Sequence, residues 1–419
     1  MSLAALAPFR VRSFRLQWPA DLLTAGAFEM ESLILGWYVL VETDSVLLLT
    51  LFGALLFAGT LVAPLFGVAG DRIGHRNLLC GMRAVYVVLA ATLMTVALHG
   101  ALSPLIVFII AGTMGMVRPS DLGVRLALVA DNVSADQLVA AMGIARTTSD
   151  CARVGGALAG AGLFAAFGIG PAYIVVASFY ALGLLLTLSI PRTPPRPALR
   201  AATMSGLRRP SAWRELREGM AYVWAAPRLL TAMLLAFLVN LTAYPLSNGL
   251  LPYVAKEIYG IDQTGLGYLV ASFAFGGLLG SVAVSTRSGI NPARMMILSS
   301  VVWYAMLLVF AQMREFYGGF AMLMLAGFAQ SFCMVTLAVL LLRNTNEAFR
   351  GRVMGVRMLA IYSLPLGLLA SGALISRIGF DTTATLYAGI GLLFTVVIAV
   401  RWRADLWRLP TPAKADRPA

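Results

Sequence analysis

Charged side chains lie inside otherwise apolar stretches of this sequence, and they are the residues whose chemistry needs an explanation. Glu29 and Glu31 both fall near the middle of the apolar run 16–41. An ionisable group at the centre of a membrane helix costs about 2.5–3.5 kcal/mol on insertion scales, so such a residue is a functional candidate by default. Because burial favours the neutral form of a carboxyl group, we predict that at least one of the two exchanges a proton or contacts a ligand. Permanent pairing with an arginine is the alternative.

The two glutamates cannot both face the same way. A helix turns by about 100° per residue, so positions two apart point in nearly opposite directions. Thr24, Glu31, Tyr38 and Glu42 follow one another at spacings of 7, 7 and 4, which makes one polar stripe. We therefore predict that Glu31 faces a central cavity, with Glu29 as the second choice.

Two neighbouring apolar runs carry the same motif, an aspartate flanked by arginines. The motif is Arg118, Asp121 and Arg125 in run 102–130, and Arg146, Asp150 and Arg153 in run 138–167. Spacings of three and four residues place each set on one helix face. If the helices are antiparallel, Arg118 matches Arg153 in depth and Arg125 matches Arg146. The set is either a static ion network, or a proton-coupled switch or anion-binding site with Arg118 and Arg153 as its deeper members.

The elements that must position these charges are membrane helices. The chain has 419 residues, of which 59% are hydrophobic and 12% are charged, whereas an average soluble domain has roughly 25% charged residues. Apolar runs of about 20 residues suit a bilayer and read as helices rather than as strands of a barrel. We count about twelve, at 16–41, 46–70, 78–98, 102–130, 138–167, 171–190, 229–252, 264–286, 294–312, 317–342, 353–375 and 382–400.

Basic residues set the predicted orientation. They concentrate in alternate connections, in both tails and in the segment 191–228. By the positive-inside rule, both termini and that segment are cytoplasmic. The predicted domains are a six-helix half at 1–190, a linker at 191–228, a second six-helix half at 229–400 and a tail at 401–419. Within the linker, Trp213–Trp224 suits an amphipathic surface helix, and a plain solvated connector is the alternative.

The two halves show internal repetition. Met142-Gly143 recurs as Met354-Gly355. Two similar six-helix halves are typical of transporters, in which the substrate binds between the halves near the middle of the membrane. The second half has little deep charge, and we predict that its polar residues line the other wall of the site: Asn240, Tyr244, Asn248 and Gln330.

A short charged turn links the second and third apolar runs. Its residues Gly67, Asp71, Arg72, Gly74 and Arg76 resemble the signature of the major facilitator superfamily, with His75 in place of a usual basic residue. Gly70 lies in the same turn and is assigned with them to the predicted gate. The resemblance implies an all-α membrane fold of twelve helices in two pseudo-symmetric halves. It also implies a cytoplasmic gate in which Asp71 meets the segment Arg350–Arg357. Arg125 is a further predicted partner of Asp71.

Other segments resemble the branch of enterobactin exporters and macrolide-type efflux proteins. They are 132–143, 350–355 and 364–367. Antiporters of the superfamily often have a glycine-rich motif with Gly-Pro in the fifth helix. The matching stretch here contains Gly155, Gly156 and Gly160 but no proline. These glycines are predicted to allow close helix packing, which is also a sufficient explanation without antiport.

The sequence therefore predicts a transporter and not an enzyme, because no nucleotide-binding, hydrolase or metal motif is evident. We expect a monomeric multi-pass protein of a bacterial inner membrane. It would use the proton gradient, with no cofactor and no nucleic-acid partner, to export amphipathic small molecules such as drugs, siderophores or metabolites, with drug resistance as one outcome. The alternatives are an importer or lysophospholipid-type flippase of the same fold, and a non-transporting sensor or scaffold.

Overall fold

The computed structural model describes residues 3–191, 212–285, 291–346 and 349–407, and every described element is helical. The first part of the chain forms η1 (Leu3–Arg10), α1 (Arg12–Thr43), α2 (Val46–Leu55), η2 (Ala58–Val62), α3 (Ala63–Ile73), α4 (His75–Leu98), α5 (Pro104–Asn132), α6 (Ala135–Phe167) and α7 (Ile169–Leu188).

The second part begins after the undescribed residues 192–211. It forms α9 (Ala212–Ala225), α10 (Pro227–Leu238), η3 (Val239–Ala243), η4 (Pro245–Gly249), α11 (Leu251–Tyr253), η5 (Val254–Ile258), α12 (Gln263–Ser285), α13 (Pro292–Phe310), α14 (Phe316–Arg343), α15 (Arg350–Ile361), α16 (Ser363–Ile378), α17 (Phe380–Arg401) and α18 (Arg403–Trp407). The segments η3, η4 and η5 are π-helical turns.

Nine helical spans among the described residues are long and apolar enough to cross a membrane. The sequence predicts about twelve. The long helices α1 and α6 are not among the nine, and they are the helices that carry Glu29, Glu31, Arg146, Asp150 and Arg153. Those charges reduce the apolar character by which a span is recognised. The second predicted run is divided among α2, η2 and α3, so it also falls short of one uninterrupted helix.

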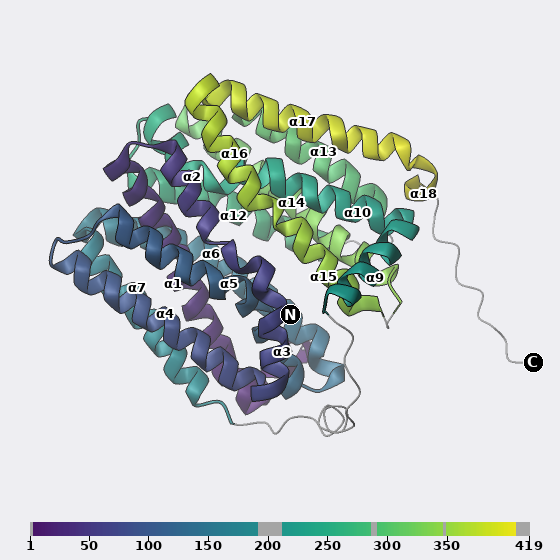
Figure 1. The fold of residues 1–419 in the computed structure, drawn as a ribbon, viewed down its shortest axis with the longest axis horizontal. Helices are drawn as coiled ribbons and strands as arrows, with labels where there is room; N and C mark the ends of the chain where they lie inside the picture. The colour runs from purple at the N-terminus through teal and green to yellow at the C-terminus, as the bar shows by residue number, and fades with distance from the viewer. Residues whose placement is uncertain (1–2, 192–211, 286–290, 347–348, 408–419) are drawn as a thin grey trace, which may run out of the picture.

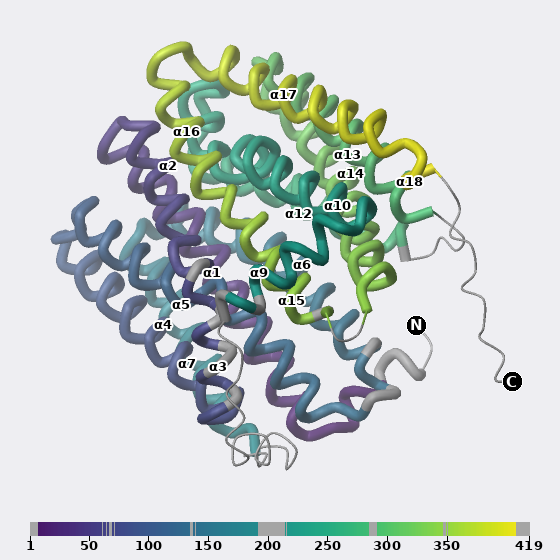
Figure 2. Tube along the Cα trace, turned by 45° about the vertical axis from the view of Figure 1, so that its right-hand side comes forward, coloured from purple at the N-terminus to yellow at the C-terminus, as the bar shows by residue number. Residues whose placement is uncertain are grey.

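The helices form two groups (Figure 1). Helices α1–α7 gather on one side of the molecule and α9–α18 on the other, and the turned view in Figure 2 shows the same division. A hydrophobic core built mainly from α10–α18 fills the second group, and a separate core built around Met30, Tyr86 and Tyr173 fills the first. We call these groups the first half and the second half.

The two halves touch near the end where α1 passes into α2. There Lys256 of η5 forms an ion pair with Asp44, which precedes α2. A Cβ atom on Gly267 of α12 would lie only 2.3 Å from Cβ of Ala161 on α6, and one on Gly372 of α16 would meet Thr50 of α2. We call this the Asp44 end, and the opposite end, where α7 stops at Leu188, the linker end.

Candidate functional site

Glu29 of α1 lies between two arginines that come from different helices. Its Oε1 is 3.9 Å from Nη2 of Arg118 on α5 and 3.9 Å from Nε of Arg153 on α6. As the mirrored spacing predicts, these two arginines reach the same depth. The Arg118 guanidinium also lies over the ring of Phe28. One carboxylate therefore serves two cations, so its protonation would change the balance of charge at a contact of three helices.

Glycines bring α6 close enough to α1 for this contact. A Cβ atom on Gly156 would lie 2.8 Å from the carbonyl oxygen of Gly26 and 2.9 Å from Cβ of Glu29. One on Gly160 would lie 2.8 Å from Cα of Met30. Gly155, predicted together with them, has no such neighbour within 4 Å. The packing role therefore belongs to Gly156 and Gly160, which hold the backbone of α6 against the turn that carries Glu29.

Glu31 does not take the position that we predicted for it. It is 2% exposed, and its carboxylate accepts hydrogen bonds from Tyr180 at 2.8 Å and from Tyr173 at 3.3 Å, both on α7. Thr24 faces the same helix, because a Cβ atom on Gly183 would meet its hydroxyl. Thr24 and Glu31 of the predicted stripe face α7 inside the first half, whereas Tyr38 donates to the carbonyl of Leu102 and Glu42 is exposed. Sequence spacing shows which residues share a face but not which neighbour that face meets.

The two aspartates of the repeated aspartate–arginine motif each form an ion pair with an arginine of their own helix. Asp150 lies 3.2 Å from Nε of Arg146, and Asp121 lies 2.9 Å from Nε of Arg125. The surroundings differ, because the side chain of Arg146 is 55% exposed while that of Arg125 is 14% exposed. Arg146 is therefore open to a ligand or solvent, and Arg125 belongs to the interior of the first half.

The second half supplies Tyr244 and Gln330 opposite these charges. Nε2 of Gln330 on α14 donates a hydrogen bond of 2.7 Å to the Tyr244 hydroxyl, and the ring of Trp303 packs edge-on against Tyr244. The Tyr244 hydroxyl also lies within electrostatic range of Arg146 and Arg153 of the first half. Tyr244 therefore joins the predicted second wall to the charged residues of the first half.

The seventh span is irregular where it carries Tyr244. This residue lies between the π-helical turns η3 and η4, and π-helical turns often mark functional positions. Of the other predicted lining residues, Asn240 is buried and donates to the carbonyl of Ala236 within its own helix. Asn248 is half-buried. Only Tyr244 and Gln330 are therefore linked directly to each other.

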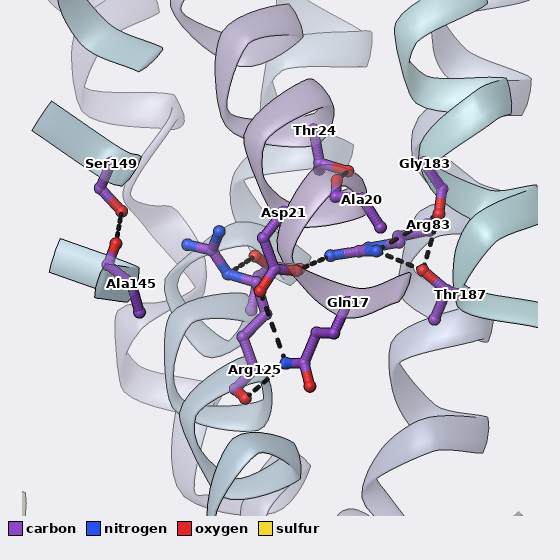
Figure 3. Close-up of polar contacts among 11 residues, drawn as sticks. Gln17, Ala20, Asp21, Thr24, Arg83, Arg125, Ala145, Ser149, Gly183 and Thr187 are labelled. Carbon is purple, nitrogen blue, oxygen red and sulfur yellow. Dashed lines mark hydrogen bonds and ion pairs between the residues drawn. The ribbon is translucent and has the colours of Figure 1, made fainter. Parts of the chain in front are cut away.

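A buried ion pair escaped the sequence reasoning altogether. Arg83 of α4 is 0% exposed and pairs with Asp21 of α1, and it donates hydrogen bonds to Thr187 and to the carbonyl of Gly183 on α7. Figure 3 shows Arg83 and Arg125 approaching Asp21 from opposite sides. Both charges lie inside apolar runs, which is the signal that could have identified them.

Gln17 completes this network. Its Nε2 donates to the carbonyl of Arg125 at 3.0 Å and lies 3.4 Å from the carboxylate of Asp21. The network thereby ties α1, α4, α5 and α7 together. We call Gln17, Asp21, Arg83, Asp121 and Arg125 the inner network, and its position within the first half favours a structural role.

The predicted gate lies at the turn between α3 and α4. Gly74 ends α3 with a φ of 87°, a conformation that favours glycine. Nε of Arg76 donates to the carbonyl of Ile190 at 2.7 Å, so its positive charge lies where the carbonyl end of α7 attracts cations. Gly70 packs against His75, and Arg72 is exposed.

The predicted latch joins this turn to the beginning of α15. The side chains of Asp71 and Arg350 and the surroundings of Gly67 lie outside the described part of the structure. The pairing of Asp71 with Arg125 or with the beginning of α15 therefore stays a prediction. Among the described residues, Arg125 pairs with Asp121 and approaches Asp21.

Comparison with known proteins places this architecture in one family. The Major Facilitator Superfamily profile matches residues 20–365 and 233–419. No curated protein sequence matches the chain. Among solved structures it is similar to the nucleoside transporter NupG, with a TM-score of 0.69, 14% identity, 95% of this chain and 100% of that one.

Other similar structures have the same fold at low identity. A POT family transporter in complex with 5-aminolevulinic acid has a TM-score of 0.71 and 13% identity, over 95% of this chain and 97% of that one. The human organic anion transporter MFSD10 (TETRAN) has a TM-score of 0.63 and 16% identity, over 92% and 99%. With the profile match over most of the sequence, the helical halves and the glycine-rich charged turn, the chain belongs to the major facilitator superfamily of transporters.

Proposed function

We propose that this protein is a proton-coupled secondary transporter that exports amphipathic small molecules, and that Glu29 couples the proton to the substrate. The observation that carries this proposal is the position of Glu29, 3.9 Å from both Arg118 and Arg153. Arg153 in turn lies within electrostatic range of Tyr244 in the second half. A change in the charge of Glu29 would thus alter the electrostatic interaction between Arg153 and Tyr244, where the two halves face each other.

The coupling follows from charge balance. With Glu29 ionised, its negative charge holds Arg118 and Arg153 and offsets the cost of desolvating them. Protonation removes this charge, so both arginines lose their partner and become available to another group. A ligand and a proton would then influence each other's affinity through one shared pair of arginines, and such linkage is reciprocal.

Alternating access supplies the transport step. The two halves are joined at the Asp44 end, through the Lys256–Asp44 pair and the close contacts of α6 with α12 and of α2 with α16. We place the linker end in the cytoplasm, because the basic residues of the sequence concentrate there. This conformation would then be closed toward the outside, and the branch resemblance favours a bacterial inner membrane.

Flux in everted membrane vesicles tests this proposal. The probes share a naphthalene body and differ in charge: 2-naphthalenesulfonate, 2-naphthalenesulfonamide and (2-naphthylmethyl)trimethylammonium. We expect at least one probe to accumulate when respiration acidifies the lumen, and its accumulation to stop when the gradient is collapsed.

The matched variants are Glu29→Gln and Glu42→Gln, both on α1, of which Glu42 is exposed. Glu29→Gln should abolish gradient-driven accumulation and Glu42→Gln should leave it intact. Uptake driven by the opposite gradient would instead identify an importer. Accumulation of no probe under either gradient, in wild type as in Glu29→Gln, would favour a sensor or scaffold.

A further inference from the structure

Phe28 lies next to the shared carboxylate and contacts one of its two arginines. The guanidinium of Arg118 lies over the ring of Phe28, the residue that directly precedes Glu29 on α1. The ring is 8% exposed and belongs to the core of the first half, together with Met30 and Tyr86. A ring packed in this way is fixed in place, because core side chains are close-packed, so it offers Arg118 a rigid surface.

Arg153 has no comparable support. Its Nε lies 3.9 Å from Oε1 of Glu29, the same distance at which Nη2 of Arg118 lies. In the part of the chain that the structure describes, Glu29 is the only ion-pair partner of Arg153, and no aromatic ring lies under its guanidinium. The side chains of Arg118 and Arg153 are 28% and 36% exposed, so burial hardly distinguishes them. The difference between the two arginines is the ring.

The carboxylate and the ring respond differently to a proton. Protonation of Glu29 removes the charge that attracts both arginines. The ring of Phe28 has no titrating group, and its quadrupole attracts a guanidinium whether or not a proton is bound nearby. Once the carboxylate is neutral, the two cations also repel each other. That repulsion displaces the arginine that is held less firmly.

We infer that Phe28 is a positioning residue, which keeps Arg118 in place when Glu29 takes up a proton, so that Arg153 alone is released. The inference rests on the proposed function, in which Glu29 carries the proton, and it specifies which arginine changes its partner. Arg153 of α6 would thus be the group that a ligand meets, whereas Arg118 stays against α1.

Chemical modification of arginine measures this release and requires no transport. Purified protein is treated with phenylglyoxal, which reacts with guanidinium groups, and mass spectrometry of peptides gives a rate for each arginine. Glu29→Gln represents the protonated state, because glutamine has nearly the same shape and no charge. Relative to wild type, the rate at Arg153 should rise about fivefold, as expected from the loss of an ion pair of about 1 kcal/mol, and the rate at Arg118 should change by less than about twofold. The exposed Arg377 of α16 should react equally in both proteins and serves as the reference.

Phe28→Leu in the Glu29→Gln background tests the ring. Leucine is apolar but has no aromatic face, so the rate at Arg118 should rise about 5- to 30-fold, since a cation–π contact contributes about 1–2 kcal/mol. Phe28→Tyr retains the face and should leave Arg118 protected. Phe52→Leu removes a ring from the same core, where no described arginine lies over it, and should not affect Arg118.

Three results would overturn the inference. They are equal rises at Arg118 and Arg153 in Glu29→Gln, no rise at Arg153 in that variant, and an Arg118 rate that stays low when Phe28→Leu is added. The first two compare arginines within Glu29→Gln, so misfolding of Phe28→Leu would not obscure them.

The anchoring role of Phe28 and the coupling role of Glu29 also fail separately. Flux that persists in Glu29→Gln, together with selective release of Arg153, would refute coupling through Glu29 and leave the role of Phe28 standing. Loss of flux in Glu29→Gln, together with equal release of Arg118 and Arg153, would refute the role of Phe28 and leave coupling standing.

Discussion

The carboxylate of Asp21 on α1 meets the guanidinium of Arg83 on α4, and the arginine is completely buried. We predict that Arg83→Met lowers the free energy of unfolding by about 3–5 kcal/mol, because it leaves Asp21 as a buried charge without its main partner. Chemical unfolding in detergent, followed by tryptophan fluorescence, measures this loss.

The controls for this variant are drawn from the same region. Arg72→Met changes an exposed arginine of α3 and should cost little. Asp21→Leu combined with Arg83→Met should recover part of the loss, since two apolar groups replace the pair. An Arg83→Met protein as stable as wild type would mean that the pair contributes nothing.

The variant Glu31→Gln distinguishes the role of Glu31 from that of Glu29 on the same helix. The glutamine oxygen still accepts one tyrosine hydrogen bond, but its amide cannot accept the second from Tyr173 or Tyr180. We expect a loss of about 1–3 kcal/mol in stability, because a buried hydroxyl remains without an acceptor. Gradient-driven flux should persist, in contrast to Glu29→Gln. Loss of flux in Glu31→Gln with normal flux in Glu29→Gln would restore our first assignment of the coupling residue.

Gly156→Ala should destabilise the protein by about 1–3 kcal/mol, since overfilling a tight contact forces the backbone to move. The added carbon would meet the Gly26 carbonyl at 2.8 Å and displace the turn of Glu29. Gly155→Ala adds the same carbon where nothing lies within 4 Å, and it should be neutral or slightly stabilising. The unfolding temperatures of the two variants, measured side by side, test this difference in stability. Equal stability would show that α1 and α6 are not in tight contact.

Lys256→Gln should favour opening at the Asp44 end, because the Lys256–Asp44 pair joins the halves there. An exposed pair contributes up to about 1 kcal/mol, so the population of the open state should rise by about fivefold at most. The readout is the alkylation rate of Thr50→Cys, which packs against Gly372 of α16, in a background with Cys80 and Cys151 replaced by serine.

Glu257→Gln is the matched control for this experiment. Glu257 also approaches Lys256, at 3.1 Å, but belongs to the same half. Its substitution should leave the alkylation rate near that of wild type. A rate that does not respond to Lys256→Gln would show that apolar contacts alone hold this end closed.

The sequence was most informative where local rules suffice. Apolar runs predict membrane helices, and the mirrored spacings predict that Arg118 and Arg153 lie at one depth, because helix geometry fixes which side chains share a face. The glycines at 156 and 160 were likewise recognisable as a close contact.

Other features depend on which helices become neighbours, and one sequence does not state this. The stripe containing Glu31 was recognised, but its partner helix α7 was not. Asp21 and Arg83 are separated by 62 residues, and nothing local links them. The π-helical turns of the seventh span are likewise not visible in the sequence, since a proline such as Pro245 indicates only an interruption of regular helix.

The π-helical turns η3, η4 and η5 give the seventh span additional residues compared with a regular α-helix of the same length. A π-turn holds an additional residue, so conversion of η3 into an α-turn would pass that residue along the chain and rotate the next part of the helix by about 100°. Tyr244 comes directly after η3. Such a conversion would rotate the Tyr244 hydroxyl toward the arginines of the first half or away from them, while α10 stays where it is.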